Sequence, residues 1–249
     1  MGFVSIDPRG RPRQAPPIWM NPVSRPQLRY RQVCSFLEER ISDRGVMALN
    51  THRCFTNSDV WTGGHYELKI WLGPPSDARI GEALASIWAS PLLEGPYRER
   101  DKEPADQPLS GPVGDHLFGL AQIRGVRLPF GTFVVREEDQ RGTRLGDFVD
   151  LYLPLGGLSI IYPVGSYPFG SIEAAKNWRP EVDAWFVQLL RGLKRPFVFQ
   201  LGIVGFEVEM TAATAPGLLS EQAKGESFDG IIRPRNAGLQ WLPPTSYES

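Results

Sequence analysis

The chain has 249 residues, of which 41% are hydrophobic and 22% are charged, and its formal net charge is −1. This length allows one large domain or two small ones with a sizeable core. A net charge near zero excludes a whole-molecule field suited to nucleic acid or to an anionic membrane. The N-terminus lacks the apolar segment of a signal peptide, and no apolar run reaches the ~18 residues of a membrane span. We therefore expect a soluble, cytoplasmic protein that does not enter a membrane.

Residues 1–23 combine prolines with arginines and hold few apolar residues. Because proline fixes φ and lacks an amide donor, this composition predicts an extended arm. Arg9, Arg11 and Arg13 are the residues that would contact nucleic acid if the arm binds it. Trp19, in an Ile-Trp-Met run, favours an arm that packs on its own domain or on a partner. A disordered tail is the alternative.

Residues 24–249 are predicted to form a single α+β domain, with two internal halves, 24–143 and 144–249, as the alternative. We expect a mixed, mainly antiparallel sheet with the helices packed mostly on one face, because strict strand–helix alternation is missing. Helices are predicted from amphipathic periodicity and end signals at about 26–43, 77–89 and 180–194. Strands are predicted from apolar alternation or apolar density at 65–72, 117–124, 132–136, 148–153, 158–162 and 197–208. Residues 90–116 show no period and are predicted to be a long, charged connection.

One strand carries the sharpest catalytic candidate, Glu67-Leu68-Lys69, downstream of Asp59. The Glu-x-Lys pair with an upstream acid, and the order of elements over 26–89, resemble the core of the PD-(D/E)xK nucleases. This resemblance implies that Asp59 and Glu67 hold Mg²⁺ while Lys69 polarises the attacking water or the phosphate. The alternative is that Glu67 and Lys69 form the outward face of an amphipathic strand. In that case the chain has no catalytic residue, metal or cofactor.

The remaining ionisable residues give weaker signals. Asp150 lies between apolar neighbours of a predicted strand, so we expect a buried carboxylate with a partner, an arginine by preference. His52, His65 and His116 are too sparse and too far apart for a zinc site or a serine triad. Cys34 and Cys54 could pair, although the position of Cys34 on an apolar helical stripe favours a buried free thiol.

Aromatic residues fall near predicted turns and on strand faces that we expect to be exposed. Exposed tryptophans and tyrosines are typical of binding surfaces, although the same residues could cover a sheet face under the long connection. The residues expected to bind are Trp19, Trp61, Tyr97, Arg98, Arg100, Tyr162, Tyr167, Phe169 and Trp178. We therefore expect a non-enzymatic protein-binding module, such as a bacterial immunity or inhibitor protein or an accessory subunit. The alternatives are a Mg²⁺-dependent nuclease and a nucleic-acid-binding component that uses the arm.

Overall fold

The structure is a computed structural model, and it describes residues 55–112, 114–164, 172–193, 196–220, 229–236 and 238–245. The chain divides into two units, Met1–Met47 and Ala48–Ser249, and all described residues belong to the second. The predicted arm, the predicted helix at 26–43, both cysteines, Trp19, Tyr167 and Phe169 lie outside the described residues. The predicted domain boundaries stay a prediction.

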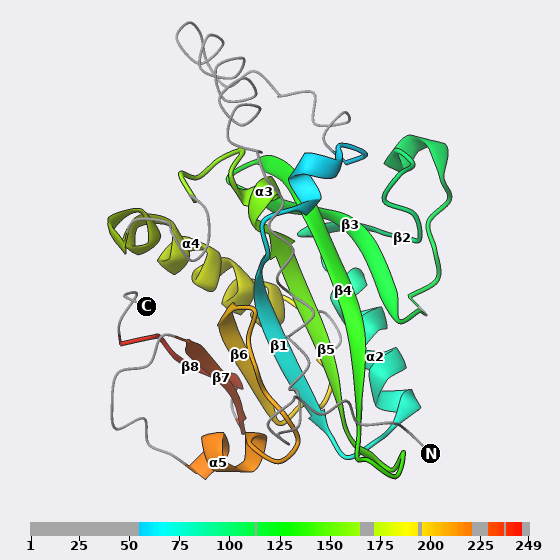
Figure 1. The fold of residues 1–249 in the computed structure, drawn as a ribbon, viewed down its shortest axis with the longest axis vertical. Helices are drawn as coiled ribbons and strands as arrows, with labels where there is room; N and C mark the ends of the chain where they lie inside the picture. Colours follow the sequence, from blue (N-terminus) through cyan, green and yellow to red (C-terminus); the bar gives the residue numbers. More distant parts are fainter. Residues whose placement is uncertain are drawn as a thin grey trace, which may run out of the picture. The chain divides into compact units, whose positions relative to one another are not determined.

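The described residues form one eight-stranded antiparallel sheet with the strand order β2-β3-β4-β5-β1-β6-β7-β8 (Figure 1). Its strands are β1 His65–Gly73, β2 Leu93–Tyr97, β3 His116–Ile123, β4 Val126–Glu138, β5 Arg144–Pro154, β6 Leu201–Phe206, β7 Gly230–Arg235 and β8 Gly238–Leu242. Short turns join β3 to β4, β4 to β5 and β7 to β8, whereas longer segments join β2 to β3 and β6 to β7. In the turn between β4 and β5, the Asp139 amide donates to the Thr143 carbonyl at 3.0 Å. The first strand β1 instead lies between β5 and β6. The predicted α+β fold class is confirmed.

A few helices complete the fold. They are α2 Asp77–Trp88, α3 Leu155–Leu158, α4 Ile172–Arg191 and α5 Ala215–Ser220, with the short 3-10 helices η2 Ser58–Trp61 and η3 Pro104–Asp106. α2 begins as predicted, because the side chain of Ser76 accepts a hydrogen bond from the Arg79 amide at 3.3 Å. No helix among the described residues is long and apolar enough to span a membrane. The expectation that the helices pack mostly on one face also covers the predicted helix at 26–43. That segment lies outside the described residues, so this expectation stays a prediction.

Several predicted boundaries are wrong. α4 begins at Ile172 and contains Pro180, because a proline can be accommodated within a helix as well as in its first turn. The segment 158–162 is not a strand, because β5 runs directly into α3 at Gly156 and Gly157. A Cβ on Gly156 would lie 2.2 Å from the Asp59 carbonyl oxygen, so this turn packs too closely against η2 for a larger residue. The predicted connection 90–116 contains the edge strand β2, and β6 is shorter than predicted.

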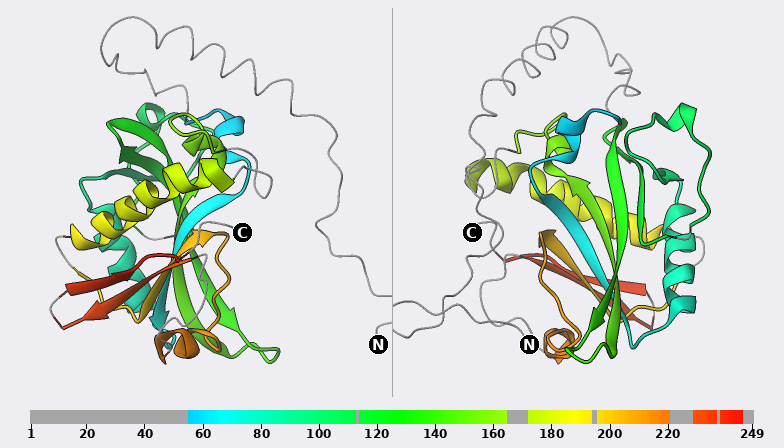
Figure 2. Two further views of the ribbon diagram at one scale, coloured as in Figure 1. Left: turned by 90° about the vertical axis from the view of Figure 1, so that its left-hand side faces the viewer. Right: turned by 45° about the vertical axis from the view of Figure 1, so that its right-hand side comes forward.

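The main core lies between the sheet and the helices α2 and α4 (Figure 2). Alternate residues of β1 point into it, as the period of two predicts: Tyr66, Leu68, Ile70 and Leu72. The apolar stripe of each helix packs against them: Ile80, Leu84, Ile87 and Trp88 from α2, and Trp178, Val182, Trp185, Phe186, Leu189 and Leu190 from α4. Each fully buried side chain of this kind stabilises the fold by roughly 1.5–3 kcal/mol.

The opposite face of the sheet is covered by two smaller clusters. At one end Phe148, Leu201 and Ile203 pack against Val208, Met210 and Ala215, which come from the segment after β6 and from α5. At the other end Tyr152 packs with Phe55, Trp61 and Tyr97. Close packing there explains Gly131, since a Cβ on it would lie 2.3 Å from the Tyr152 ring. Both faces of the sheet therefore bury aromatic residues.

Candidate functional site

Four of the aromatic residues that were predicted to be exposed are buried. Their exposed fractions are 8% for Trp61, 5% for Tyr97, 5% for Tyr162 and 1% for Trp178. The Trp61 ring nitrogen donates to the Phe55 carbonyl at 2.7 Å, and its ring meets Phe118 edge to face. The Trp178 ring packs against Tyr66 and Phe206. The predicted exposure is wrong because covering segments lie over both faces of the sheet.

Arg98 and Arg100 are exposed, at the start of the segment 98–115 that connects β2 to β3. Hydrogen bonds inside this segment hold it in place, including those from the Gln107 side-chain amide to the carbonyls of Glu99 and Lys102, at 2.6 and 2.8 Å. The predicted role of the two arginines in binding stays a prediction.

Glu67 and Lys69 point to one face of β1, as predicted, and meet Asp150 of β5 there. The register places Lys69 directly opposite Asp150, and the Lys69 Nζ–Asp150 Oδ2 distance is 2.9 Å. Asp150 is 1% exposed, so its predicted burial is confirmed. Its partner is Lys69 rather than the arginine that the sequence led us to expect, because the antiparallel register of β1 and β5 selects the neighbour.

Burial sets the protonation of this group, which we call the β1–β5 charge network (Glu67, Lys69 and Asp150). The pKa of Glu67 is raised to about 8, mainly by burial and then by the nearby Asp150 carboxylate, while Lys69 partly opposes these two causes. Burial also raises the pKa of Asp150 to about 6, although Lys69 lowers it. Asp150 Oδ1 has no hydrogen-bond partner among the described residues. At neutral pH the network therefore holds a largely protonated Glu67 and an Asp150 that is neutralised by Lys69.

Asp59 lies apart from this network. It is exposed in η2, where its backbone amide donates a hydrogen bond to the capping Asn57 Oδ1 at 3.0 Å. The charges that act on Glu67 are those of Asp150, Lys69 and Glu207, and Asp59 is not among them. Over the described part of the chain, no three His, Cys, Asp or Glu side chains gather where they could hold a metal ion. The structure thus brings Glu67 and Lys69 together with Asp150 rather than with Asp59.

Two histidines flank Tyr152 on the same face. His116 Nε2 lies 2.7 Å from the Tyr152 hydroxyl, and the His65 ring lies 4.4 Å from the Tyr152 ring. Burial lowers the pKa of both histidines and raises the pKa of Tyr152. A neutral His116 can then accept the hydrogen bond of the Tyr152 hydroxyl. The hydrogen bond between His116 and Tyr152 and the ring contact of His65 with Tyr152 hold these three side chains together.

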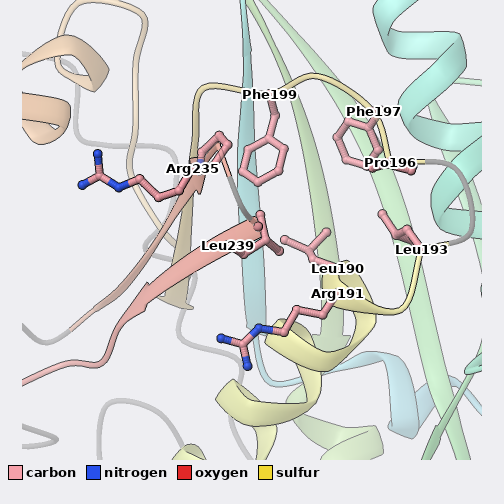
Figure 3. A pocket seen from close by; sticks show the side chains of 10 residues that line it. Leu190, Arg191, Leu193, Pro196, Phe197, Phe199, Arg235 and Leu239 are labelled. Carbon is pink, nitrogen blue, oxygen red and sulfur yellow. The ribbon is translucent and has the colours of Figure 1, made fainter.

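An apolar pocket of about 340 Å³ lies next to β7 and β8, the last two strands of the sheet (Figure 3). It is formed where the end of α4, the segment 196–199 and the turn between β7 and β8 meet, and its lining residues are Leu190, Arg191, Leu193, Pro196, Phe197, Phe199, Pro234, Arg235, Gly238 and Leu239. Figure 3 shows the apolar side chains turned toward one another, while the side chains of Arg191 and Arg235 extend away from them. The lining contains two cationic groups and no acidic group.

The strand beside this pocket is the last of the sheet. β8 pairs with β7 on one side, and no described strand follows it on the other. In an antiparallel sheet, alternate residues of such an edge strand turn their amide and carbonyl groups away from the only neighbour. Gly238 and Leu239 belong both to β8 and to the pocket lining. We call the pocket and β8 together the β8 edge site.

Sequence reasoning missed the β8 edge site. Its walls come from three stretches of chain that are distant in sequence, and only their folding brings them together. The sequence signal at this place is the apolar run Phe197-Val198-Phe199 after several basic residues, and this run by itself predicts only the beginning of a strand.

Comparison of the chain with protein-family models, with curated proteins and with solved structures gives no match. The class defined by the fold is therefore an α+β protein built on one antiparallel sheet with an apolar pocket at one of its edges.

Proposed function

We propose that this protein is a non-enzymatic binding module that captures an extended segment of another protein at the β8 edge site. The observation that carries the proposal is the position of the apolar pocket directly beside an edge strand. An extended peptide can add to a sheet edge through backbone hydrogen bonds, while neighbouring pockets select its side chains. Both parts of that mode of recognition are present here.

The dimensions of the site fit this use. β8 has five residues, which is a usual length for a strand, and Pro243 and Pro244 end it. Because proline cannot donate a backbone hydrogen bond, pairing is confined to Gly238–Leu242. One side chain of an added strand near Leu239 would reach the pocket. A pocket of about 340 Å³ can hold a large apolar side chain, since ligand pockets begin at roughly 300 Å³.

The β1–β5 charge network supports the non-enzymatic part of the proposal, because its ionisable groups satisfy one another. Its lysine and aspartate neutralise each other at 2.9 Å, and its remaining carboxyl group is kept largely protonated by burial. Such groups hold two strands together without needing a ligand. The captured segment would belong to a protein that this chain inhibits, as an immunity protein does, or assists, as an accessory subunit does.

Selection from a library of random peptides tests the proposal. We expect peptides enriched on the wild-type protein to lose binding to Leu239→Asp, which places a charge inside the pocket, and to Leu193→Asp on the opposite wall. Leu145→Asp is the matched control, because Leu145 is 44% exposed on β5 and lies outside the pocket. Circular dichroism checks that each variant is folded. Enriched peptides that bind both pocket variants as tightly as wild type, or no enrichment at all, would contradict the proposal.

A further inference from the structure

We infer that the segment captured at the β8 edge site is acidic, so that its carboxylates meet Arg191 and Arg235 while an apolar side chain enters the pocket. This inference rests on the proposed function and specifies the chemistry of the partner. Its basis is the composition of the lining: two arginines, no acid, and otherwise apolar residues and glycine.

The two arginines approach the site from different elements. Arg191 is the last residue of α4, and Arg235 is the last residue of β7, paired with Gly238 of β8. Arg235 donates from Nε to Gln240 Oε1 at 2.8 Å. Neither arginine forms an ion pair with an acid in the described part of the chain.

Three arginines elsewhere in the fold have the carboxylate partners that Arg191 and Arg235 lack among the described residues. Arg124, Arg136 and Arg144 are all matched by carboxylates at 2.5–3.1 Å. The described charge at the β8 edge site is therefore positive, from Arg191 and Arg235. An anionic partner is therefore the one that this charge complements.

The edge strand decides between the anionic partners that could meet such a charge. Nucleic acid also binds to arginines, but it gains nothing from a strand edge, whereas an extended peptide pairs with it. The pocket walls contain two phenylalanines and three leucines, which suit a leucine or phenylalanine side chain of that peptide. The partner segment therefore combines acidic residues with a large apolar residue.

Two synthetic peptides test the inference on the full-length protein by fluorescence anisotropy. One alternates leucine with glutamate, and the other alternates leucine with lysine. We expect the glutamate peptide to bind at least about tenfold more tightly, and added salt to weaken it, because like charges oppose the lysine peptide. Arg191→Gln and Arg235→Gln should each weaken the glutamate peptide about threefold, as exposed ion pairs do. Arg141→Gln is the matched control, on the exposed turn between β4 and β5.

The other outcomes are informative in different ways. Equal binding of both peptides, abolished for both by Leu239→Asp, would overturn the acidic preference and leave the proposed function standing. If library-selected peptides bind but the glutamate peptide does not, the acidic preference is likewise overturned and the proposed function stands. A single-stranded oligonucleotide that displaces the glutamate peptide would overturn the inference in favour of nucleic acid. A wild-type dimer that Leu239→Asp dissociates would overturn it in favour of a second copy of the chain.

Discussion

The β1–β5 charge network and the β8 edge site use ionisable side chains in opposite ways. In the network, the partly buried Lys69 lies 2.9 Å from the buried Asp150, and Glu67 is kept largely protonated beside them. At the edge, Arg191 and Arg235 lie beside an apolar pocket, and none of its lining residues is acidic. The comparison teaches that convergence of charges is no sign of a site when those charges satisfy one another. Unmatched charge beside apolar surface is the better indication of a ligand.

The largest expected effect concerns Glu67 and pH. Because its folded-state pKa of about 8 lies above the ordinary value of 4.5, the stability linked to its protonation is complete below about pH 4.5 and is lost as the pH rises to about 8. The loss is on the order of 5 kcal/mol. We expect Glu67→Gln to remove this part of the pH dependence and to be the more stable protein at about pH 9.

Urea unfolding of wild type and Glu67→Gln across this pH range measures the effect. Asp150, with its pKa raised from 3.8 to about 6, adds a smaller loss at lower pH in both proteins. Equal pH dependence of the two proteins above about pH 6 would show that Glu67 is not buried as described.

The next effect breaks the ion pair itself. Lys69→Met should destabilise the fold by about 3 kcal/mol, because Asp150 would remain buried without its partner. Arg124→Met is the matched control: its pair with Glu181 is exposed, at 56% and 39%, and its loss should change stability by less than about 1 kcal/mol. The two free energies of unfolding come from chemical denaturation. Similar losses of unfolding free energy in both variants would contradict the claim that the Lys69–Asp150 pair contributes more to stability than the exposed Arg124–Glu181 pair.

The smallest effect on stability is expected at the edge site. Arg191→Gln and Arg235→Gln should leave the free energy of unfolding within about 0.5 kcal/mol of wild type, because both side chains extend away from the apolar core. Thermal unfolding measures this. A large loss from either variant would mean that these arginines hold the fold together, as the β1–β5 charge network does.

Local patterns predicted the elements that depend on nearby residues. β1 follows from its alternation, and α2 follows from the Ser76 cap and a four-residue apolar stripe. The predicted beginning of α4 was wrong because it relied on Pro180. Proline is favoured in the first turn of a helix, but it also occurs within a helix at the cost of one backbone hydrogen bond, as it does here.

The candidate site was less predictable because it depends on long-range register and covering segments. The burial of Asp150 could be predicted from its apolar neighbours, but its pairing with Lys69 depends on the alignment of β1 with β5. Trp61 and Trp178 looked like surface residues because the sequence does not show which segments cover the sheet. The β8 edge site needed α4, the segment 196–199 and β8 to be placed together.

Amide hydrogen exchange of the full-length protein, with and without a peptide selected on it, tests the central claim most directly. The account predicts slower exchange at Gly238–Leu242, because an added strand would engage the amides on the outer edge of β8. Protection confined to the segment 98–115, with β8 unchanged, would contradict it and would return the interface to the charged connection around Arg98 and Arg100.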